Sequence, residues 1–283
     1  MATLLNKGKK RDKEMSFLEH LEELRWHIIR SVIAIVVLMI IAFCMKKIIF
    51  DIIILGPQKP DFITARLLCK LGELMHTDLC INQNPANLIN INMAGQLTTH
   101  IVTSLVAGLI LAFPVVLWEF WKFFEPALKP NEAKYARGTV FVSSMLFFVG
   151  VSFGYFALAP LSIHFLTTYE VSMDVVNQIN IRSYIGTITS ICLATGIIFE
   201  LPIIAFFLTK VGIITPDFMR KFRKHAYIIL LILAAIITPP DVFSQILVVF
   251  PLAILYEASI FLTGRAARKH QQTIAEEEAK ING

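Results

Sequence analysis

Residues 185 to 208 read IGTITSICLATGIIFELPIIAFFL, an uncharged run interrupted only by Glu200. The run is long enough to cross a bilayer as a helix. A carboxylate at the middle of a membrane helix costs about 2.5–3.5 kcal/mol even on the mildest scale, so such a residue usually faces a partner, a cavity or a substrate. Pro202 removes a backbone hydrogen bond and bends the helix beside it. The stretch therefore predicts a kinked membrane span whose carboxylate is either functional or protonated and bonded to a neighbouring helix.

The composition of the whole chain is that of a membrane protein. Of its 283 residues, 56% are hydrophobic and 17% are charged, and the mean hydropathy is +0.67, which no ordinary soluble domain of this length shows. We therefore predict an all-α, polytopic integral membrane protein with about six transmembrane helices. The apolar runs that predict them are Trp26–Met45, Gly95–Leu117, Gly138–Pro160, Tyr184–Leu208, Ala226–Ile237 and Val242–Leu262.

The last two of these helices are predicted to be short. Ala226–Ile237 covers about 18 Å of a hydrocarbon core that is about 30 Å thick. Val242–Leu262 contains Gln245 and Glu257, which leave a similarly short apolar centre. Short spans are accommodated by thinning of the surrounding bilayer. The connection between the two helices is a tight turn, predicted on the periplasmic side, through Pro239, Pro240 and Asp241.

Lysine and arginine set the orientation of the chain. The cytoplasmic loops of membrane proteins carry an excess of these residues. One set of segments holds 19 of the 26 basic residues and the alternate set holds 6. The first set comprises residues 1–25, 118–137, 209–225 and the tail from Gly264, and the second comprises 46–94, 161–183 and 238–241.

This imbalance predicts that both termini are cytoplasmic. We predict a single membrane domain, 1–283. In that domain a cytoplasmic amphipathic segment (1–25) precedes the helix bundle (26–262), and a cytoplasmic tail (263–283) follows it. The net charge of +5 is thus a signal of topology, and no nucleic-acid partner is predicted.

The long outer loop, 46–94, has two features of its own. It contains Cys69 and Cys80, on the side of the membrane where the environment oxidises thiols, so a disulfide between them is plausible. Residues 65–75 have the pattern of a short helix that lies on the membrane surface.

No pattern in the sequence predicts an enzyme, a metal site or a cofactor. The segment His20-Leu21-Glu22-Glu23-Leu24 lacks the second histidine of a zinc-protease helix. Gly150-Val151-Ser152-Phe153-Gly154 matches the nucleophile elbow of hydrolases, but it lies inside an apolar helix, where this spacing of glycines favours close helix packing. There is no phosphate-binding loop and no dinucleotide fingerprint.

Four longer motifs occur in order along the chain. They are Phe17-Leu18-Glu19-His20-Leu21-Glu22-Glu23-Leu24-Arg25, Trp121-Lys122-Phe123-Phe124-Glu125-Pro126-Ala127-Leu128, Phe199-Glu200-Leu201-Pro202 and Thr238-Pro239-Pro240-Asp241-Val242-Phe243-Ser244-Gln245. With these motifs the chain resembles, over nearly its full length, the TatC family, the multispanning receptor of the twin-arginine protein translocase. In that family a small residue usually stands where this chain has Glu125, and the first outer loop is shorter.

The resemblance implies a receptor that binds the twin-arginine signal peptides of folded cargo proteins at the cytoplasmic face. It also implies recruitment of TatA/TatB-type single-span subunits for export driven by the proton-motive force, self-association, and contact with membrane lipid. The residues implied at the signal-peptide site are Glu23, Glu132, Arg25, His20 and Phe123, and those implied at intramembrane partner contacts are Glu200, Gln245 and Glu257.

The chemistry of arginine fits this expectation. A guanidinium group is planar and permanently charged, and it makes two parallel hydrogen bonds to one carboxylate, which lysine cannot do. Glu23 and Glu132 are therefore expected to hold the two arginines. The alternative is that Glu19, Glu22 and Glu23 form a solvated helix face that pairs with Arg25.

A second hypothesis is a proton- or ion-coupled secondary transporter in which Glu200 and Glu257 relay protons. Transporters of that class tend to have internal repeats with interrupted helices at matching positions of each half. No such repeat is apparent in this sequence, because the short pair of helices occurs only near the carboxyl end.

Overall fold

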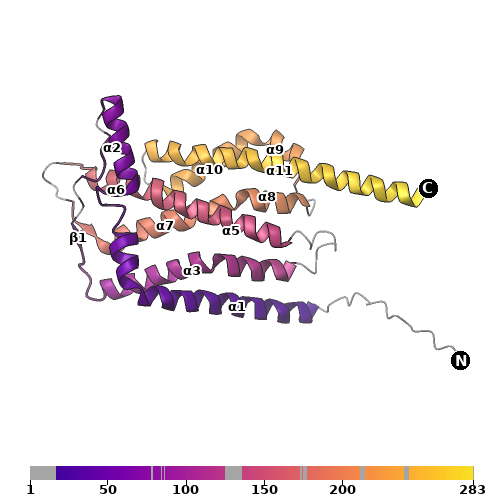
Figure 1. Cartoon of the computed structure of the whole chain (residues 1–283), viewed down its shortest axis with the longest axis horizontal. Coiled ribbons are helices and arrows are strands. Elements are labelled where there is room, and N and C mark those ends of the chain that lie inside the picture. Colours follow the sequence, from indigo (N-terminus) through magenta and orange to yellow (C-terminus); the bar gives the residue numbers. More distant parts are fainter. Residues whose placement is uncertain are drawn as a thin grey trace.

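The computed structural model describes residues 17–77, 79–83, 85, 87–124, 136–172, 174, 177–210, 214–238 and 242–282. Long helices lie lengthwise beside one another (Figure 1), which confirms the predicted all-α membrane architecture. Among these described residues, five helical segments are long and apolar enough to cross a membrane: Leu21–Cys44, Gly95–Phe123, Gly138–Thr168, Ile181–Thr209 and Gln245–Arg265.

The helices of the bundle follow the predicted runs. In chain order they are α1 (Phe17–Cys44), α3 (Gly95–Phe124), α5 (Ala136–Phe153), the π-helical turn η3 (Gly154–Leu158), α6 (Ala159–Thr168), α7 (Ile181–Phe199), α8 (Leu201–Lys210), α9 (Pro216–Lys221), α10 (Arg223–Ile237) and α11 (Val242–Asn282). Helix α1 begins and α11 ends at the same end of the bundle (Figure 1). We call this end the α1 end.

The last two helices differ in length. Helix α10 has 15 residues, which span about 22 Å of a core about 30 Å thick, so it is short as predicted. Helix α11 is longer than predicted. It has 41 residues, and its segment Gln245–Arg265 is long enough to span. This segment includes Glu257, whose carboxylate is paired with Arg223.

Small residues let α5 pack tightly on α7, as the Gly150 and Gly154 spacing predicted. A Cβ atom added at Gly150 would lie 2.7 Å from the carbonyl oxygen of Thr195, and one added at Gly154 would lie 3.1 Å from the Cα atom of Cys192. The first distance is too short for any side chain, the second is tighter than nearly all Cβ contacts, and a Cβ at Gly154 would also overlap the Thr195 hydroxyl. Both positions therefore require glycine for the two helices to approach so closely.

The opposite end of the bundle is closed by the segment between α1 and α3, which was predicted to be an outer loop. It contains the π-helical turn η1 (Ile48–Ile54), α2 (Ile63–Met75) and β1 (Leu88–Ile89), and β1 pairs in parallel with β2 (Ile179–Asn180) of the segment between α6 and α7. The Tyr184 hydroxyl donates a hydrogen bond of 2.9 Å to the Ile54 carbonyl. We call this end the α2 end. Its disulfide joins Cys69 to Cys80, the pair that the sequence favoured, with Cα atoms 4.2 Å apart.

Candidate functional site

A cluster of charged side chains joins α1 to α3 near the α1 end. Oε2 of Glu119 lies 2.7 Å from Nδ1 of His27, with which it shares a hydrogen bond, and 3.6 Å from Nη1 of Arg30. Oε1 of Glu119 lies 3.6 Å from Nζ of Lys122. We call these four residues the α1–α3 charge cluster.

The members of this cluster differ in exposure. The Glu119 side chain is 9% exposed, whereas those of Arg30 and Lys122 are 57% and 41% exposed. A nearly buried carboxylate therefore has one hydrogen-bonded partner and two cations that also face outward. Such pairing is what a carboxylate within a membrane helix requires. The surface beside the cluster is left with more positive than negative charge.

The structure brings two of the predicted signal-peptide residues to this cluster. Glu23 lies on α1 one turn before His27, and its side chain is exposed. The Phe123 ring at the end of α3 meets the His27 ring edge to face, with centroids 6.3 Å apart. The first turns of α1 and the last turn of α3 thus form one surface.

The three other residues predicted at this site, Arg25, His20 and Glu132, are not seen at the cluster. Nη2 of Arg25 lies 3.4 Å from Oε1 of Glu22, and both side chains are exposed, so Arg25 pairs with Glu22 and not with Glu23. His20 lies on α1, but its side chain is outside the part that the structure describes, and Glu132 lies outside the described residues altogether.

Glu119 is a candidate functional residue that the sequence reasoning missed. The predicted span ended at Leu117, which put Glu119 in a loop, whereas the apolar segment runs to Phe123. Glu200 was singled out because it is a carboxylate inside an apolar run. The same argument would have singled out Glu119 if the predicted span had continued to Phe123.

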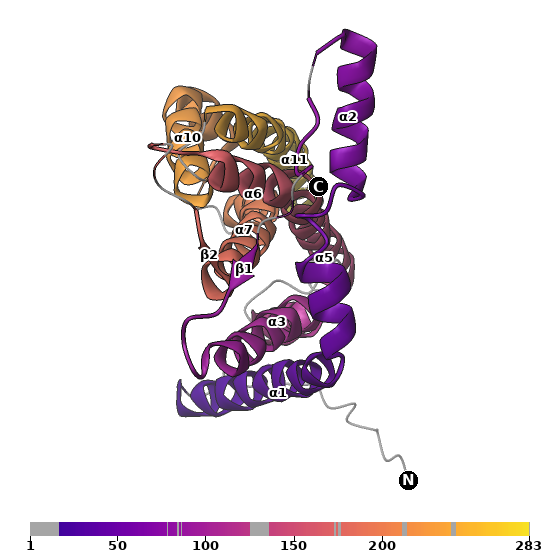
Figure 2. The same cartoon turned by 90° about the vertical axis from the view of Figure 1, so that its left-hand side faces the viewer.

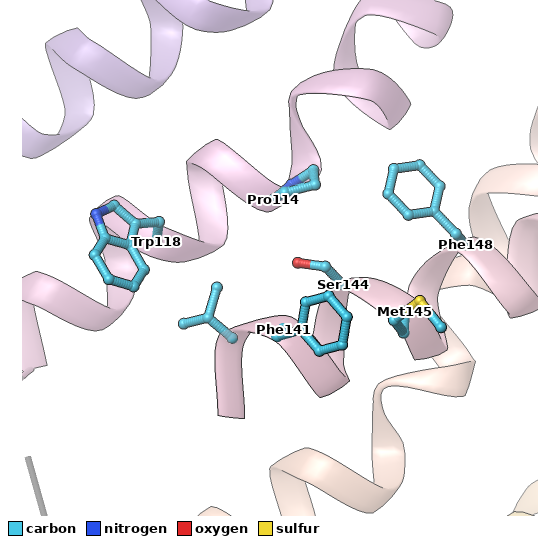
Figure 3. A pocket seen from close by; sticks show the side chains of 7 residues that line it. Pro114, Trp118, Phe141, Ser144, Met145 and Phe148 are labelled. Carbon is cyan, nitrogen blue, oxygen red and sulfur yellow. The ribbon is translucent and has the colours of Figure 1, made fainter. Parts of the chain in front are cut away.

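An apolar groove of about 420 Å³ lies between α3 and α5. Helix α3 contributes two of its lining residues and α5 the others, and the Ser144 hydroxyl points into the space between the two helices (Figure 3). Trp118 also stacks under the α1–α3 charge cluster, because Nζ of Lys122 lies 5.5 Å from the centroid of its ring. The groove therefore begins beside the cluster. It is lined by Pro114, Trp118, Val140, Phe141, Ser144, Met145 and Phe148.

Glu200 lies at a break between two helices, as predicted. Helix α7 ends at Phe199, Glu200 is its C-cap, and α8 begins at Leu201. The Glu200 side chain is buried and accepts a hydrogen bond at Oε2 from the Ser143 hydroxyl of α5. Within the described part of the chain, Oε1 of Glu200 is buried without a hydrogen-bond partner. This oxygen can accept a further hydrogen bond, and a buried acceptor without one is costly.

The two other predicted intramembrane polar residues lie on α11. Both carboxylate oxygens of Glu257 are engaged within the chain, one 2.7 Å from Nη2 of Arg223 and the other 2.7 Å from the Tyr227 hydroxyl. Gln245 donates a long hydrogen bond, 3.4 Å, to the Leu231 carbonyl of α10. Glu257 thus ties α11 to the first turns of α10. The predicted turn residues Pro239, Pro240 and Asp241 lie outside the described residues.

Comparison with known proteins gives a consistent result. The family model described as Sec-independent protein translocase protein (TatC) matches residues 19–251. A Sec-independent protein translocase protein TatC from Blattabacterium sp. subsp. Periplaneta americana is 44% identical over 264 residues, which cover 92% of this chain and 99% of that one. The TatC protein of Aquifex aeolicus is 35% identical over 259 residues, covering 91% and 98% of the two chains.

A solved structure agrees with these relatives in fold. The crystal structure of a twin-arginine translocase receptor, TatC, in the detergent DDM has a TM-score of 0.67 and 34% sequence identity, and the match covers 86% of this chain and 99% of that one. The residues that the family model matches, 19–251, include those of the α1–α3 charge cluster and Glu200. The chain is a multi-pass membrane protein that belongs to the TatC family of Sec-independent protein translocase proteins.

Proposed function

We propose that this chain is the receptor subunit of a twin-arginine translocase in the inner membrane, with both termini in the cytoplasm. The α1 end is then the cytoplasmic end, and the surface formed by α1 and α3 binds the paired arginines of signal peptides. Glu23 and Glu132 are the carboxylates that hold them. The observation that carries this proposal is the exposed Glu23 carboxylate one turn before His27, whose ring meets both Phe123 and Glu119, at the end of the bundle to which the basic segments belong.

The charge cluster supports this placement of the arginines. Arg30 is an exposed cation about two turns deeper along α1 than Glu23, and Lys122 is an exposed cation next to Phe123 on α3. Like charges repel at these distances, and more strongly near a membrane than in water. The two cations therefore oppose entry of the signal-peptide arginines into the bilayer and keep them at the level of Glu23.

The groove between α3 and α5 suits the next part of a signal peptide. Signal peptides carry an apolar segment of about 7–15 residues after their basic region. The groove has apolar walls and begins at Trp118, under Lys122. A peptide whose arginines lie on the α1–α3 surface can thus bury its apolar segment between α3 and α5.

Binding of matched peptides tests the proposed function. The full chain is reconstituted in nanodiscs, and two labelled signal peptides that differ only in Arg-Arg against Lys-Lys are titrated. We expect the Arg-Arg peptide to bind at least tenfold more tightly, and a photocrosslinker at Phe123 to capture it. Equal affinity for the two peptides would contradict a receptor role for this surface.

Filling the groove should weaken signal-peptide binding. In the Ser144→Trp variant the indole ring would occupy the space between α3 and α5. Excluding roughly 60 Å² of apolar peptide surface from the groove costs about 1.5 kcal/mol, so we expect about tenfold weaker binding of the Arg-Arg peptide. The matched control is Val142→Trp, because Val142 is on the same helix, is exposed and does not line the groove. Equal affinities of the two variants would show that the peptide does not use the groove.

We further assign the free oxygen of Glu200 to a single-span partner subunit. A polar side chain of such a partner can donate to Oε1, which is buried without a partner in the described chain. Glu200→Ala should reduce co-purification of TatA/TatB-type subunits severalfold while the affinity for the Arg-Arg peptide stays within about twofold, and Ser143→Ala serves as the control for the internal hydrogen bond. Parallel loss of both activities in a folded Glu200→Ala protein would indicate a structural role.

A further inference from the structure

Helix α2 has an orientation unlike that of the spans. It lies at the α2 end of the bundle and runs crosswise to α1, α3 and α5 (Figure 1). In the view along the bundle (Figure 2), α2 extends beyond the outline of the other helices. Since the spans run along the membrane normal, α2 lies roughly parallel to the membrane plane and reaches out over the surrounding lipid.

One side of α2 is covered by the chain that follows it. Ala65 and Gly72 are buried. A Cβ atom added at Gly72 would lie 2.6 Å from the carbonyl oxygen of Thr77 and 2.9 Å from the backbone nitrogen of Leu79. The Cys69–Cys80 disulfide holds the returning segment against this side. The returning segment therefore cannot cover the rest of the helix.

The remaining surface of α2 separates into a charged side and an apolar side. Arg66, Lys70 and Glu73 are exposed and form the charged side. The apolar side has helical spacing, and its residues are between 42% and 79% exposed, so nothing in the described chain covers them. These residues, which we call the α2 apolar face, are Ile63, Leu67, Leu71, Leu74 and Met75.

The first turn of α2 fixes the direction of the apolar face. Thr64 and Leu71 are seven residues, about two turns, apart, so they lie on the same side of the helix. The Thr64 hydroxyl donates a hydrogen bond to the Phe156 carbonyl of η3. The Phe62 ring, just before the helix, stacks on the Phe156 ring with centroids 5.8 Å apart.

Phe156 belongs to the apolar span Gly138–Thr168, and the whole of α6 follows η3 before that span ends. The side of α2 that carries Thr64 and Leu71 is therefore the side on which the helix meets this span.

We propose that α2 is an interfacial anchor, a helix that rests on the outer leaflet with its apolar face inserted at the boundary of headgroups and acyl chains. Amphipathic helices that lie in the membrane plane bind lipid in this way. Arg66, Lys70 and Glu73 then face headgroups and water. The disulfide keeps the returning segment on the third side of the helix, so the apolar face stays directed at the bilayer. The anchor widens the footprint of the protein at the α2 end and opposes tilting of the bundle.

Site-specific quenching by lipid tests the proposal. A genetically encoded, environment-sensitive fluorescent amino acid is placed at Leu71 or, as the matched control, at Glu73 on the charged side. The full-length, disulfide-bonded chain is reconstituted at one copy per nanodisc, with phosphatidylcholine and phosphatidylglycerol whose acyl chains are either native or brominated. We expect brominated chains to quench the probe at Leu71 at least twofold and to leave the probe at Glu73 unchanged.

Two other occupants of the apolar face give different results. A probe at Leu71 that is shielded from water but not quenched by brominated chains would mean that protein, such as a second copy of the chain, covers the face. A probe that reports water at Leu71 would mean that the face is solvated. Either result overturns the proposal.

A second variant keeps the test independent of the probe position. The double substitution Leu67→Glu, Leu71→Glu changes exposed residues, so the bundle should fold. It should abolish lipid quenching of a probe at Leu74. Persistent quenching at Leu74 in that variant would contradict insertion of the apolar face.

Discussion

Replacing Glu23 or Glu132 with alanine should weaken binding of an Arg-Arg signal peptide by roughly ten- to a hundredfold. Hydrogen bonds between charged groups contribute about 1.5–3 kcal/mol when partly shielded from water, and each 1.4 kcal/mol corresponds to about tenfold in affinity. Titration of labelled peptide into nanodisc-embedded protein measures the change. Glu22→Ala is the matched control. Glu22 lies next to Glu23, but its exposed carboxylate pairs with Arg25, and such surface pairs contribute little.

Specificity should fall together with affinity. The advantage of Arg-Arg over Lys-Lys comes from the bidentate geometry of the guanidinium group, so with both carboxylates removed it should nearly vanish. A double-mutant cycle that combines each Glu→Gln change with each Arg→Lys change of the peptide identifies which arginine meets which carboxylate. Coupling energies near zero in folded, membrane-inserted variants would mean that Glu23 belongs to a solvated helix face, as the alternative interpretation of the sequence holds.

The lengths of the apolar runs predicted the helix bundle well, because a segment that crosses a membrane can adopt few structures. A span must be a helix of about 20 apolar residues. The run around Glu200 therefore predicted α7 and α8, and the glycine spacing in α5 predicted close packing against another helix, which is α7. The same length rule placed the end of α3 too early. It treated Glu119 as a loop residue, although a charged residue can end an apolar run or lie inside one when it is paired.

The contacts at the α2 end could not be predicted from local patterns. They depend on residues far apart in the sequence, such as the hydrogen bond from Tyr184 to Ile54 and the pairing of Leu88 with Ile179. The π-helical turns η1 and η3 have no sequence signal of the kind that caps or turn residues give. The charge cluster is similar, since His27 and Glu119 become neighbours only when α1 lies against α3.

Helix α1 is attached to the bundle chiefly through α3. Along much of its length its side chains are exposed within the described chain, among them Val32, Ile33 and Val36. Three contacts fix it to α3. At the α2 end the Phe43 and His100 rings stack 4.0 Å apart. One turn along α1, Gly108 of α3 lies against the α1 backbone, since a Cβ atom added there would lie 2.6 Å from the nitrogen of Met39. At the α1 end the His27 ring meets Glu119.

Substituting Glu119 should therefore free the end of α1 that carries Glu23. In Glu119→Ala the largely buried His27 loses its hydrogen-bond partner, which costs about 1–3 kcal/mol, and the exposed cations Arg30 and Lys122 lose the carboxylate they share. We expect a clearly lower thermal unfolding temperature in detergent and a weaker affinity for the Arg-Arg peptide. Glu119→Gln should recover most of both, because an amide oxygen still accepts a hydrogen bond from His27. Lys122→Ala should change stability by less than about 1 kcal/mol, since that side chain is 41% exposed.

The contacts at Phe43 and Gly108 remain in all three variants, so α1 should stay in the membrane, and crosslinking between α1 and α3 at the α2 end should persist. Wild-type stability and affinity in Glu119→Ala would mean that the cluster neither holds α1 nor positions Glu23 for the signal peptide.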